Sequence, residues 1–429
     1  MTAIEYIISF LICDTELIPL VWYGDEASAP DGARLIVIPS GFFQGGIYGT
    51  NRTMPQTPFP MIPETDIPFL YGKAEVEYEE AERTVLHADL IASAYFMLSR
   101  YEEILKPHCR DQYGRFLAKD AVVFQQGYGM RPLVDEWGRY MRWLLYKAGV
   151  DLPFEKTGIR KIYLTHDVDV PFVLYRKDQV LRQWIKNFIH RGKRISHPLY
   201  VYKHPEKDPL NTFEMIIKAD TSLQKRYGKE KVESIYFLIS AGSKQTKTYC
   251  DIMLKKYKDL VVRLTHSGAT LGLHVSLEAG ANPELIVYEM ERLLENYPAA
   301  STKSRHHYLR WTEPEHIDQM ARGGITEDFT LEYADSVGFR VGTCRPYYFI
   351  NPRSQRVSTI LEHPMVIMEC SLDRQNYMGL TYEDALATCI NLIDTTREFN
   401  GELVLLFHNP IWSEDSYYGK LYERIIEYL

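Results

Sequence analysis

The chain has 429 residues, of which 45% are hydrophobic and 25% are charged. This is the composition of an ordinary globular protein, and it excludes a disordered or collagen-like chain. The 49 basic and 57 acidic residues give a net charge of −8, which argues against a general nucleic-acid or anionic-membrane binder. The length is sufficient for two or three domains.

Cysteine spacing and hydropathy bear on the cellular location. The six cysteines lie far apart without a Cys-x-x-Cys pair, so we expect free thiols. No run approaches 18 uncharged apolar residues, which predicts that no helix spans a membrane. The apolar run at residues 7–12 has no basic segment before it and no small-residue cleavage site after it, so we expect no signal peptide. These features together predict a cytoplasmic protein.

The first 150 residues are expected to form a small α/β domain. Short apolar runs at residues 4–13 and 35–39, broken by Pro and Gly, predict short strands. Apolar residues three and four apart predict a long helix at residues 89–105 and a second helix at residues 134–148. We expect the second helix to pack this domain against the region that follows.

From residue 160 onward, compact apolar runs alternate with helical patterns. This alternation predicts right-handed parallel βα units, and about seven of them in one region predict a barrel or a doubly wound sheet. We therefore predict two domains, residues 1–150 and residues 151–429. The apolar runs lie at residues 161–164, 234–240, 270–277, 304–309, 325–331, 365–370 and 402–407, and the helical patterns at residues 220–227, 249–257, 283–295, 314–323 and 382–399.

Residues 173–208 interrupt this alternation and are rich in Lys and Arg. Between residues 176 and 207 the cations are interrupted by Trp184, Ile185 and Phe188 at helical spacing. This pattern predicts a solvated excursion near the barrel mouth and not a nucleic-acid site.

Reactive side chains follow four of the predicted strands. Because the carboxyl ends of parallel strands in a barrel face one shared mouth, we expect these side chains to meet there. Asp167 and Asp169 are two residues apart on an extended segment, so both carboxylates point to one side. The whole set comprises Asp167, Asp169, His274, Arg305, His306, His307 and His408.

In their order along the chain, these positions resemble the motifs of the polysaccharide deacetylase family, the NodB-homology group of carbohydrate esterase family 4. The segment Thr165-His166-Asp167-Val168-Asp169 resembles the family's Thr-Phe-Asp-Asp motif with one residue inserted. His274 matches the first His of the His-x-x-x-His motif, in which Glu278 replaces the second His. Arg305 fits the arginine motif, and Leu406-Phe407-His408 fits the final Leu-x-His motif.

The resemblance runs from about residue 160 to the C-terminus and implies a distorted (β/α)7 barrel, here preceded by a smaller α/β domain. It implies a metal-dependent hydrolase that removes N-acetyl or O-acetyl groups from an amino sugar or polysaccharide. By this match Asp167 is the general base, His408 is the general acid, and Arg305 keeps Asp167 ionised and oriented. The first 150 residues also resemble the uncharacterised domain that precedes such deacetylase domains, through residues 89–103 and 110–116.

The same match makes Asp169 and His274 ligands of one divalent metal. For the third ligand we prefer His307 to Glu278, because an imidazole on the fourth strand can point into the mouth. Zinc fits mixed imidazole and carboxylate ligation, and Co, Ni and Mn are the other candidates. A cation there would address the two difficulties of amide hydrolysis, a poor nucleophile and a costly oxyanion.

Two other functions are compatible with the sequence. The first is a glycosyltransferase in which Asp167 and Asp169 hold a metal and a nucleotide sugar, which leaves His274 and His408 without a role. The second is a barrel that has lost its metal and serves as a glycan-binding or scaffold protein, and Glu278 in place of the family's His favours it.

Overall fold

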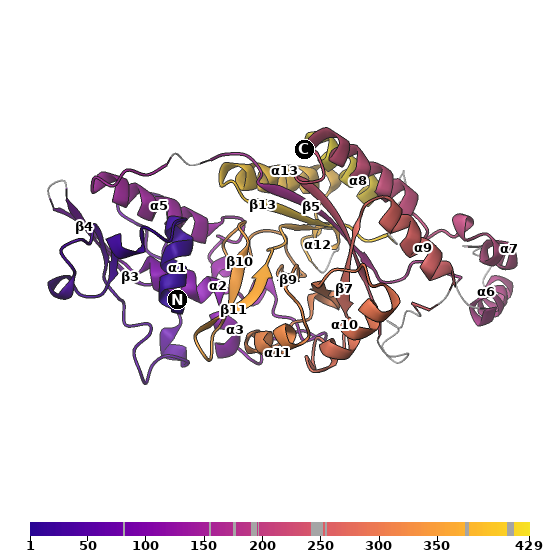
Figure 1. The fold of residues 1–429 in the computed structure, drawn as a ribbon, viewed down its shortest axis with the longest axis horizontal. Helices are drawn as coiled ribbons and strands as arrows, with labels where there is room; N and C mark the ends of the chain where they lie inside the picture. The colour runs from indigo at the N-terminus through magenta and orange to yellow at the C-terminus, as the bar shows by residue number, and fades with distance from the viewer. Residues whose placement is uncertain are drawn as a thin grey trace.

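The computed structural model describes residues 1–79, 82–153, 156–174, 177–189, 195, 197–241, 252–253, 255–373, 377–409 and 416–429. These residues form two β-sheets, one of four strands within residues 1–150 and one of nine strands within residues 151–429. Figure 1 shows the two sheets side by side along the longest axis of the molecule. The division into two independent domains at residue 150 stays a prediction.

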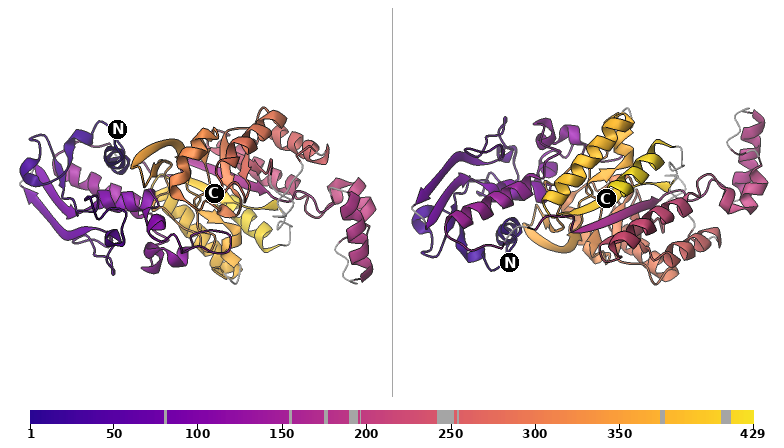
Figure 2. Two further views of the ribbon diagram at one scale, coloured as in Figure 1. Left: turned by 90° about the horizontal axis from the view of Figure 1, so that it is seen from below. Right: turned by 90° about the horizontal axis from the view of Figure 1, so that it is seen from above.

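The N-terminal sheet has the strand order β1-β2-β4-β3. Its strands pair in parallel except for the antiparallel pair β3 and β4. Helices α1, α2 and α5 pack together beside it (Figure 2). The strands are β1 (Val21–Tyr23), β2 (Leu35–Val37), β3 (Gly72–Glu79) and β4 (Arg83–Ala88), and the helices are α1 (Ala3–Ile12), α2 (Leu90–Leu98), α3 (Tyr101–Leu105), α4 (Val122–Gln125) and α5 (Leu133–Lys147).

Two predictions for this region are wrong. The apolar run at residues 4–13 forms helix α1 and not a strand, because Thr2 and Glu5 make a reciprocal capping box at its start. The predicted helix at residues 89–105 is divided into α2 and α3 by Arg100, whose φ of 56° is left-handed. Arg100 holds this conformation while it pairs with Glu103 and donates to the carbonyl of Trp311, about two hundred residues away. The predicted strand at residues 35–39 and the predicted helix at residues 134–148 are confirmed as β2 and α5.

The second sheet has the order β10-β11-β9-β8-β7-β6-β5-β13-β12 and curls into a half-barrel (Figure 1). All seven apolar runs overlap one of its parallel strands, so the predicted fold class is confirmed. A hairpin, β10 and β11, extends one edge and has no counterpart in the prediction. The strands are β5 (Lys161–Val168), β6 (Val232–Leu238), β7 (Thr270–Val275), β8 (Lys303–His306), β9 (Glu327–Asp328), β10 (Tyr347–Asn351), β11 (Arg356–Glu362), β12 (Ile367–Met368) and β13 (Glu402–Leu406).

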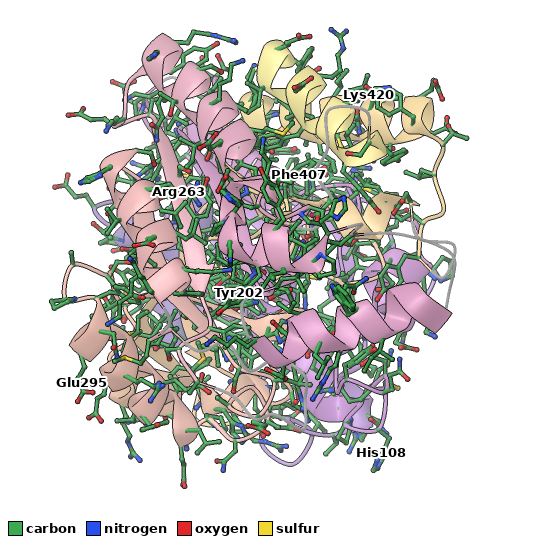
Figure 3. All side chains as sticks on the ribbon, turned by 90° about the vertical axis from the view of Figure 1, so that its right-hand side faces the viewer. His108, Tyr202, Arg263, Glu295, Phe407 and Lys420 are labelled. Carbon is green, nitrogen blue, oxygen red and sulfur yellow. The ribbon has the colours of Figure 1, made fainter. Side chains whose placement is uncertain are left out.

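Helices follow the parallel strands and pack on their outer side or on one another. The segment predicted as helical at residues 249–257 is described only in part, and α9 begins at Lys255. Seen from the end of the molecule in Figure 3, Arg263 of α9 and Glu295 of α10 lie at the periphery, and Phe407 lies nearer the centre. The helices are α8 (Phe213–Tyr227), α9 (Lys255–His266), α10 (Leu285–Asn296), α11 (Ile317–Arg322), α12 (Glu369–Asp373), α13 (Tyr382–Glu398) and α14 (Tyr417–Tyr428).

The described part of the basic segment forms helices α6 (Lys177–Ile189) and α7 (Pro198–Lys203). They lie between β5 and α8 in the chain and project away from the sheet, on the side opposite the N-terminal region (Figures 1 and 2). Trp184 and Ile185 on α6 are exposed. Residues 175–176, 190–194 and 196 of this segment lie outside the described residues.

Two hydrophobic clusters account for most of the core, beside a third, small cluster of Phe116, Ala118, Ala121 and Tyr333. The larger one is continuous from Leu11 and Trp137 in the N-terminal region to Tyr347 and Leu405 in the second sheet. The smaller one lies between strands of the curled sheet and includes Phe237. This inner layer supports the carboxyl ends of the strands, where the polar side chains gather.

Five cysteines are described, and none of them forms a disulfide: Cys13, Cys109, Cys344, Cys370 and Cys389. Cys250 lies outside the described residues. In the described part of the chain, no helix combines the length and apolar character that a bilayer crossing needs. The cytoplasmic location stays a prediction.

Candidate metal centre

The polar side chains at the strand ends line one pocket of about 290 Å³. Its walls come from both parts of the chain. The residues that line it are Tyr113, Arg115, Asp167, Asp169, His307, Tyr308, Leu309, Met368, Cys370, Tyr377, Leu406 and His408.

Strand alternation places the two carboxylates of the Asp-x-Asp pair toward this pocket. Asp167 is on β5 and Asp169 follows its last residue, and both line the pocket. His166, between Thr165 and Asp167, points the opposite way and contacts Asp220 on α8 at 3.2 Å. At the end of β8, His306 stacks on Trp311, whereas His307, the next residue, lines the pocket.

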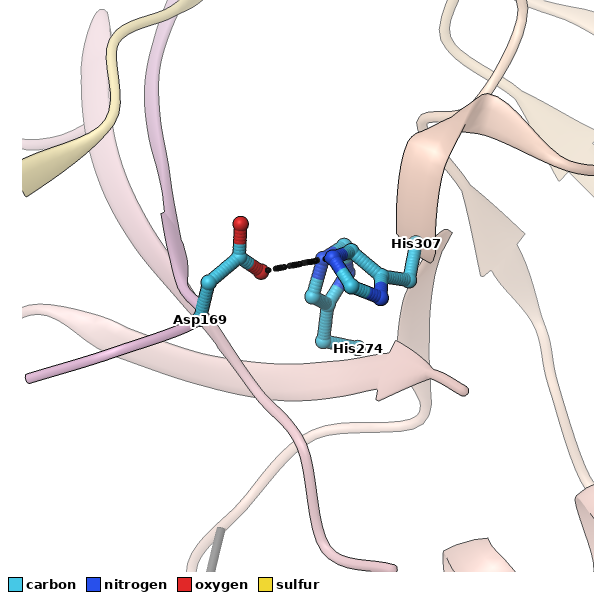
Figure 4. Close-up of side chains that lie close together, drawn as sticks. All are labelled: Asp169, His274 and His307. Carbon is cyan, nitrogen blue, oxygen red and sulfur yellow. Dashed lines mark ion pairs between the residues drawn. The ribbon is translucent and has the colours of Figure 1, made fainter. Parts of the chain in front are cut away.

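Asp169, His274 and His307 bring one donor atom each into a single group, all within 4.8 Å of one another. Oδ1 of Asp169 lies 3.1 Å from Nε2 of His274 and 3.3 Å from Nε2 of His307 (Figure 4). Asp169 Oδ1 and His274 Nε2 are buried polar atoms without a hydrogen-bond partner. Buried atoms of this kind need a partner, and a cation in contact with all three donors would supply it. The residues present therefore fit a divalent metal.

The protonation state of this group also suits a cation. Nδ1 of His274 lies 2.9 Å from the carbonyl oxygen of Arg305, so Nδ1 carries a hydrogen and Nε2 is the nitrogen that would bind a metal. Burial raises the pKa of Asp169, but the imidazoles of His307 and His274 outweigh burial and hold that pKa well below its usual range. Asp169 is therefore an ionised carboxylate, the form in which a carboxylate binds a metal.

Glu278, the other candidate for the third ligand, lies elsewhere. It is half-buried in the turn after β7 and is not part of the donor group. The imidazole of His307 belongs to the donor group instead. His307 is followed by Tyr308 and Leu309, whose φ angles of 59° and 55° are left-handed. Such strained backbone is typical of functional sites.

Asp167 lies beside the donor group and is held by Arg305. Nη1 of Arg305 lies 3.2 Å from Oδ1 of Asp167 and donates to Oγ1 of Thr165 at 2.7 Å. Nε of Arg305 donates to the carbonyl of Phe329 at 3.0 Å, and the whole side chain is inaccessible to solvent. Arg305 is thus fixed from three sides, and it fixes the carboxylate of Asp167 in turn.

His408 lies near the second carboxylate oxygen of Asp167, the one that Arg305 does not contact. Its Nε2 is 3.8 Å from Oδ2 of Asp167, and Nε2 of His274 is 3.6 Å from the same oxygen. Nδ1 of His408 is 2.6 Å from Oε1 of Glu369, which also accepts from the backbone N–H of His408. Burial lowers the pKa of His408, but the carboxylate of Glu369 and the thiol of Cys370 raise it well above its ordinary value.

Glu369 is a site residue that the sequence analysis missed. It follows β12 directly and is fully buried. The sequence gives one signal for Glu369, a carboxylate near the end of the apolar run at residues 365–370. Asp167 was selected because it lies at the end of a predicted strand in the same way. Glu369, Cys370 and His408 also bring three donor atoms within 4.8 Å. In this second group, unlike the group that contains Asp169, Nδ1 of His408 and Oε1 of Glu369 are already hydrogen-bonded to each other at 2.6 Å.

Comparisons with known proteins add the following. Residues 9–149 match the profile of a family described as "Family of unknown function (DUF7033)". Among solved structures, the chain is similar to one described as "putative polysaccharide deacetylase from Mycobacterium smegmatis", with 16% sequence identity and a TM-score of 0.39. That similarity covers 65% of this chain and 85% of the other. No curated protein matches the sequence.

Proposed function

We propose that this protein is a metal-dependent hydrolase that removes N-acetyl or O-acetyl groups from an amino sugar or a polysaccharide. One observation carries the proposal. The donor group of Asp169, His274 and His307 lies beside a carboxylate held by an arginine and a histidine held by a carboxylate, all at one pocket.

The three donors would hold the metal, with zinc the first candidate and Co, Ni and Mn the alternatives. Asp169 contributes a carboxylate oxygen, and His274 and His307 contribute one imidazole nitrogen each, a set with three protein ligands as in other catalytic zinc sites. When bound, the cation would polarise the acyl carbonyl and lower the pKa of a water molecule.

The remaining groups supply proton transfer. Asp167 is the general base that takes a proton from the attacking water, and its ion pair with Arg305 keeps its carboxylate oriented. His408 is the general acid that gives a proton to the departing amine or alcohol from Nε2, because its Nδ1 is engaged by Glu369. The 3.8 Å between His408 and Asp167 lets both groups reach the same scissile bond.

The test is release of acetate from a panel of N-acetylglucosamine oligomers and O-acetylated sugars, with Zn, Co, Ni or Mn added to the purified protein. We expect the wild type to release acetate with at least one metal and Asp167→Asn to release it at least about a hundredfold more slowly. Glu278→Gln is the matched control, because Glu278 lies outside the donor group and its loss should leave activity unchanged. No acetate from any substrate with any metal would favour the scaffold function instead.

The other two functions have less support. The scaffold function was favoured because Glu278 replaces a histidine that would be the third metal ligand. His307 offers an imidazole beside Asp169 and His274, so the donor group does not depend on Glu278. A glycosyltransferase would need Asp167 free for a metal, yet Asp167 is paired with Arg305.

A further inference from the structure

The N-terminal region has no assigned role, yet two of its residues line the pocket. We infer that Tyr113 and Arg115, together with Tyr308, form a rim that binds an uncharged sugar ring of the substrate. This inference rests on the proposed function and goes beyond it, since it gives the N-terminal region a part in substrate recognition.

The rim is a stack of three side chains from two regions of the chain. The rings of Tyr113 and Tyr308 are nearly parallel, with centroids 4.7 Å apart and an interplanar angle of 12°. The guanidinium carbon of Arg115 lies 5.0 Å from the centroid of the Tyr113 ring. Tyr308 directly follows the metal donor His307, and the two rings are 4.4 Å apart. The stack therefore begins next to the proposed metal and continues outward onto the N-terminal region.

A tight turn at residues 111–115 holds the N-terminal half of the rim. Oδ1 of Asp111 accepts from the backbone N–H groups of Tyr113 and Arg115, each at 2.9 Å. Gly114 has a φ of +80°, and a Cβ there would lie 3.2 Å from Arg310 and Thr312. The turn thus depends on glycine and lies close against the second region of the chain. It is built before any ligand arrives, which lowers the entropic cost of binding.

The second region also holds Arg115 directly. Nη2 of Arg115 donates to the hydroxyl of Tyr377 at 3.0 Å, and Nη1 lies 3.5 Å from the carbonyl of Tyr308. The side chain of Arg115 is buried, with 8% of it exposed. Removal of Arg115 would therefore disturb both regions, so Tyr113 is the rim residue that is changed in the test.

Charge and shape indicate the class of ligand. Oδ2 of Asp111 accepts from Nη2 and Nε of Arg115 at 2.6 Å and 2.8 Å, so the arginine charge is already neutralised and does not call for an anionic substrate. Tyr308 is 40% exposed. A tyrosine ring combines apolar carbons with a polar hydroxyl, and the part of the stack that faces the pocket can contact the apolar carbons and the hydroxyl groups of a pyranose. The rim therefore fits a neutral N-acetylated saccharide better than an acidic one.

The inference is tested by equilibrium binding to the zinc-loaded Asp167→Asn protein, which should bind substrate without turnover. The probe is the best substrate of the acetate panel, or the N-acetylglucosamine tetramer if the panel shows no release. In this background Tyr113→Leu should bind the sugar about tenfold more weakly, the size expected from one aromatic contact. Tyr113→Phe should bind normally, because the flat ring is kept.

Two measurements separate recognition from a structural effect. Zinc content of Tyr113→Leu should equal that of its parent, and its thermal melting temperature should be unchanged. Tyr348→Ala is the matched control, because Tyr348 is 44% exposed, packs edge-on against Tyr6 and does not line the pocket.

Equal affinity of Tyr113→Leu and its parent would overturn the inference, as would loss of zinc from Tyr113→Leu or failure of the parent to bind any saccharide. Failure of the proposed function has a different signature. In that case the unaltered protein releases no acetate, while sugar binding still depends on the ring of Tyr113.

Discussion

Nδ1 of His408 lies 2.6 Å from Oε1 of Glu369, and this contact determines which nitrogen of His408 faces the pocket. Because Glu369 occupies Nδ1, Nε2 is directed toward Asp167. Burial works against a charged imidazole, but the neighbouring carboxylate raises the pKa of His408 well above its ordinary value. His408 is therefore protonated at neutral pH, as a general acid must be.

Glu369→Gln should move the alkaline limit of activity to lower pH. Removal of the carboxylate lowers the pKa of His408, so the acid loses its proton at a lower pH and kcat declines earlier as pH rises. The measurement is the pH profile of kcat for the variant and the wild type, with zinc content as the control. An alkaline limit identical to that of the wild type would show that Glu369 does not act through His408.

Asp169→Ala and His274→Ala should each yield folded protein without metal. Each removes one of three donors, and the two that remain are a weak site for zinc. Elemental emission measures the metal, and circular dichroism measures the fold. Glu278→Gln should retain a full equivalent of metal. If both alanine variants also retain it, the metal lies elsewhere.

Asp167→Asn should keep the fold and the metal, because the amide is nearly isosteric with the carboxylate. It should lower kcat by about 10²- to 10⁴-fold, the contribution typical of a general base. Steady-state kinetics and a thermal melt check both parts. A variant that is fully active but melts at a lower temperature would make Asp167 a structural residue.

Glu103→Gln should destabilise the protein by about 3–5 kcal/mol, because it leaves buried arginines without a countercharge. Oε1 of Glu103 is 2.6 Å from Arg340 and Oε2 is 2.6 Å from Arg100, and all three side chains are buried. Urea unfolding at neutral pH measures the change. The exposed pair of Arg139 and Glu398 offers a control, and Glu398→Gln should change the free energy of unfolding by about 1 kcal/mol or less.

The contribution of Glu103 should also depend on pH. Burial raises the pKa of Glu103, but Arg100 and Arg340 outweigh burial and lower it to about 2. A carboxylate whose folded pKa is depressed stabilises the protein above its ordinary pKa, and this stabilisation is lost as pH falls toward the folded value. The difference between wild type and Glu103→Gln should therefore shrink below about pH 4.5. A difference independent of pH would mean that folding does not shift the pKa of Glu103.

The basic segment between residues 176 and 207 should not bind nucleic acid. On α6 the exposed Leu181, Trp184 and Ile185 stand among the cations and interrupt any continuous phosphate-binding surface. Fluorescence anisotropy with labelled duplex and single-stranded DNA, at low and high salt, should show no tight binding. Tight binding that weakens steeply with added salt would contradict this prediction.

The sequence by itself determined the strands of the second sheet and the residues at their ends. Apolar runs mark the parallel strands because these are buried on both faces. The spacing of Asp167 and Asp169 follows from the alternation of side chains along a strand. The sequence also contains a local signal for α1, because Thr2 and Glu5 have the spacing of a capping box. The apolar run that follows was interpreted as a strand instead.

Only the tertiary structure decided which of these residues meet. His307 reaches Asp169 and Glu278 does not, because β8 lies next to β7 in the sheet while Glu278 turns away after β7 has ended. The contact of Tyr113 with Tyr308 joins residues almost two hundred positions apart. No local pattern encodes such contacts, because they depend on how separate segments pack after each has formed its own helix, strand or turn.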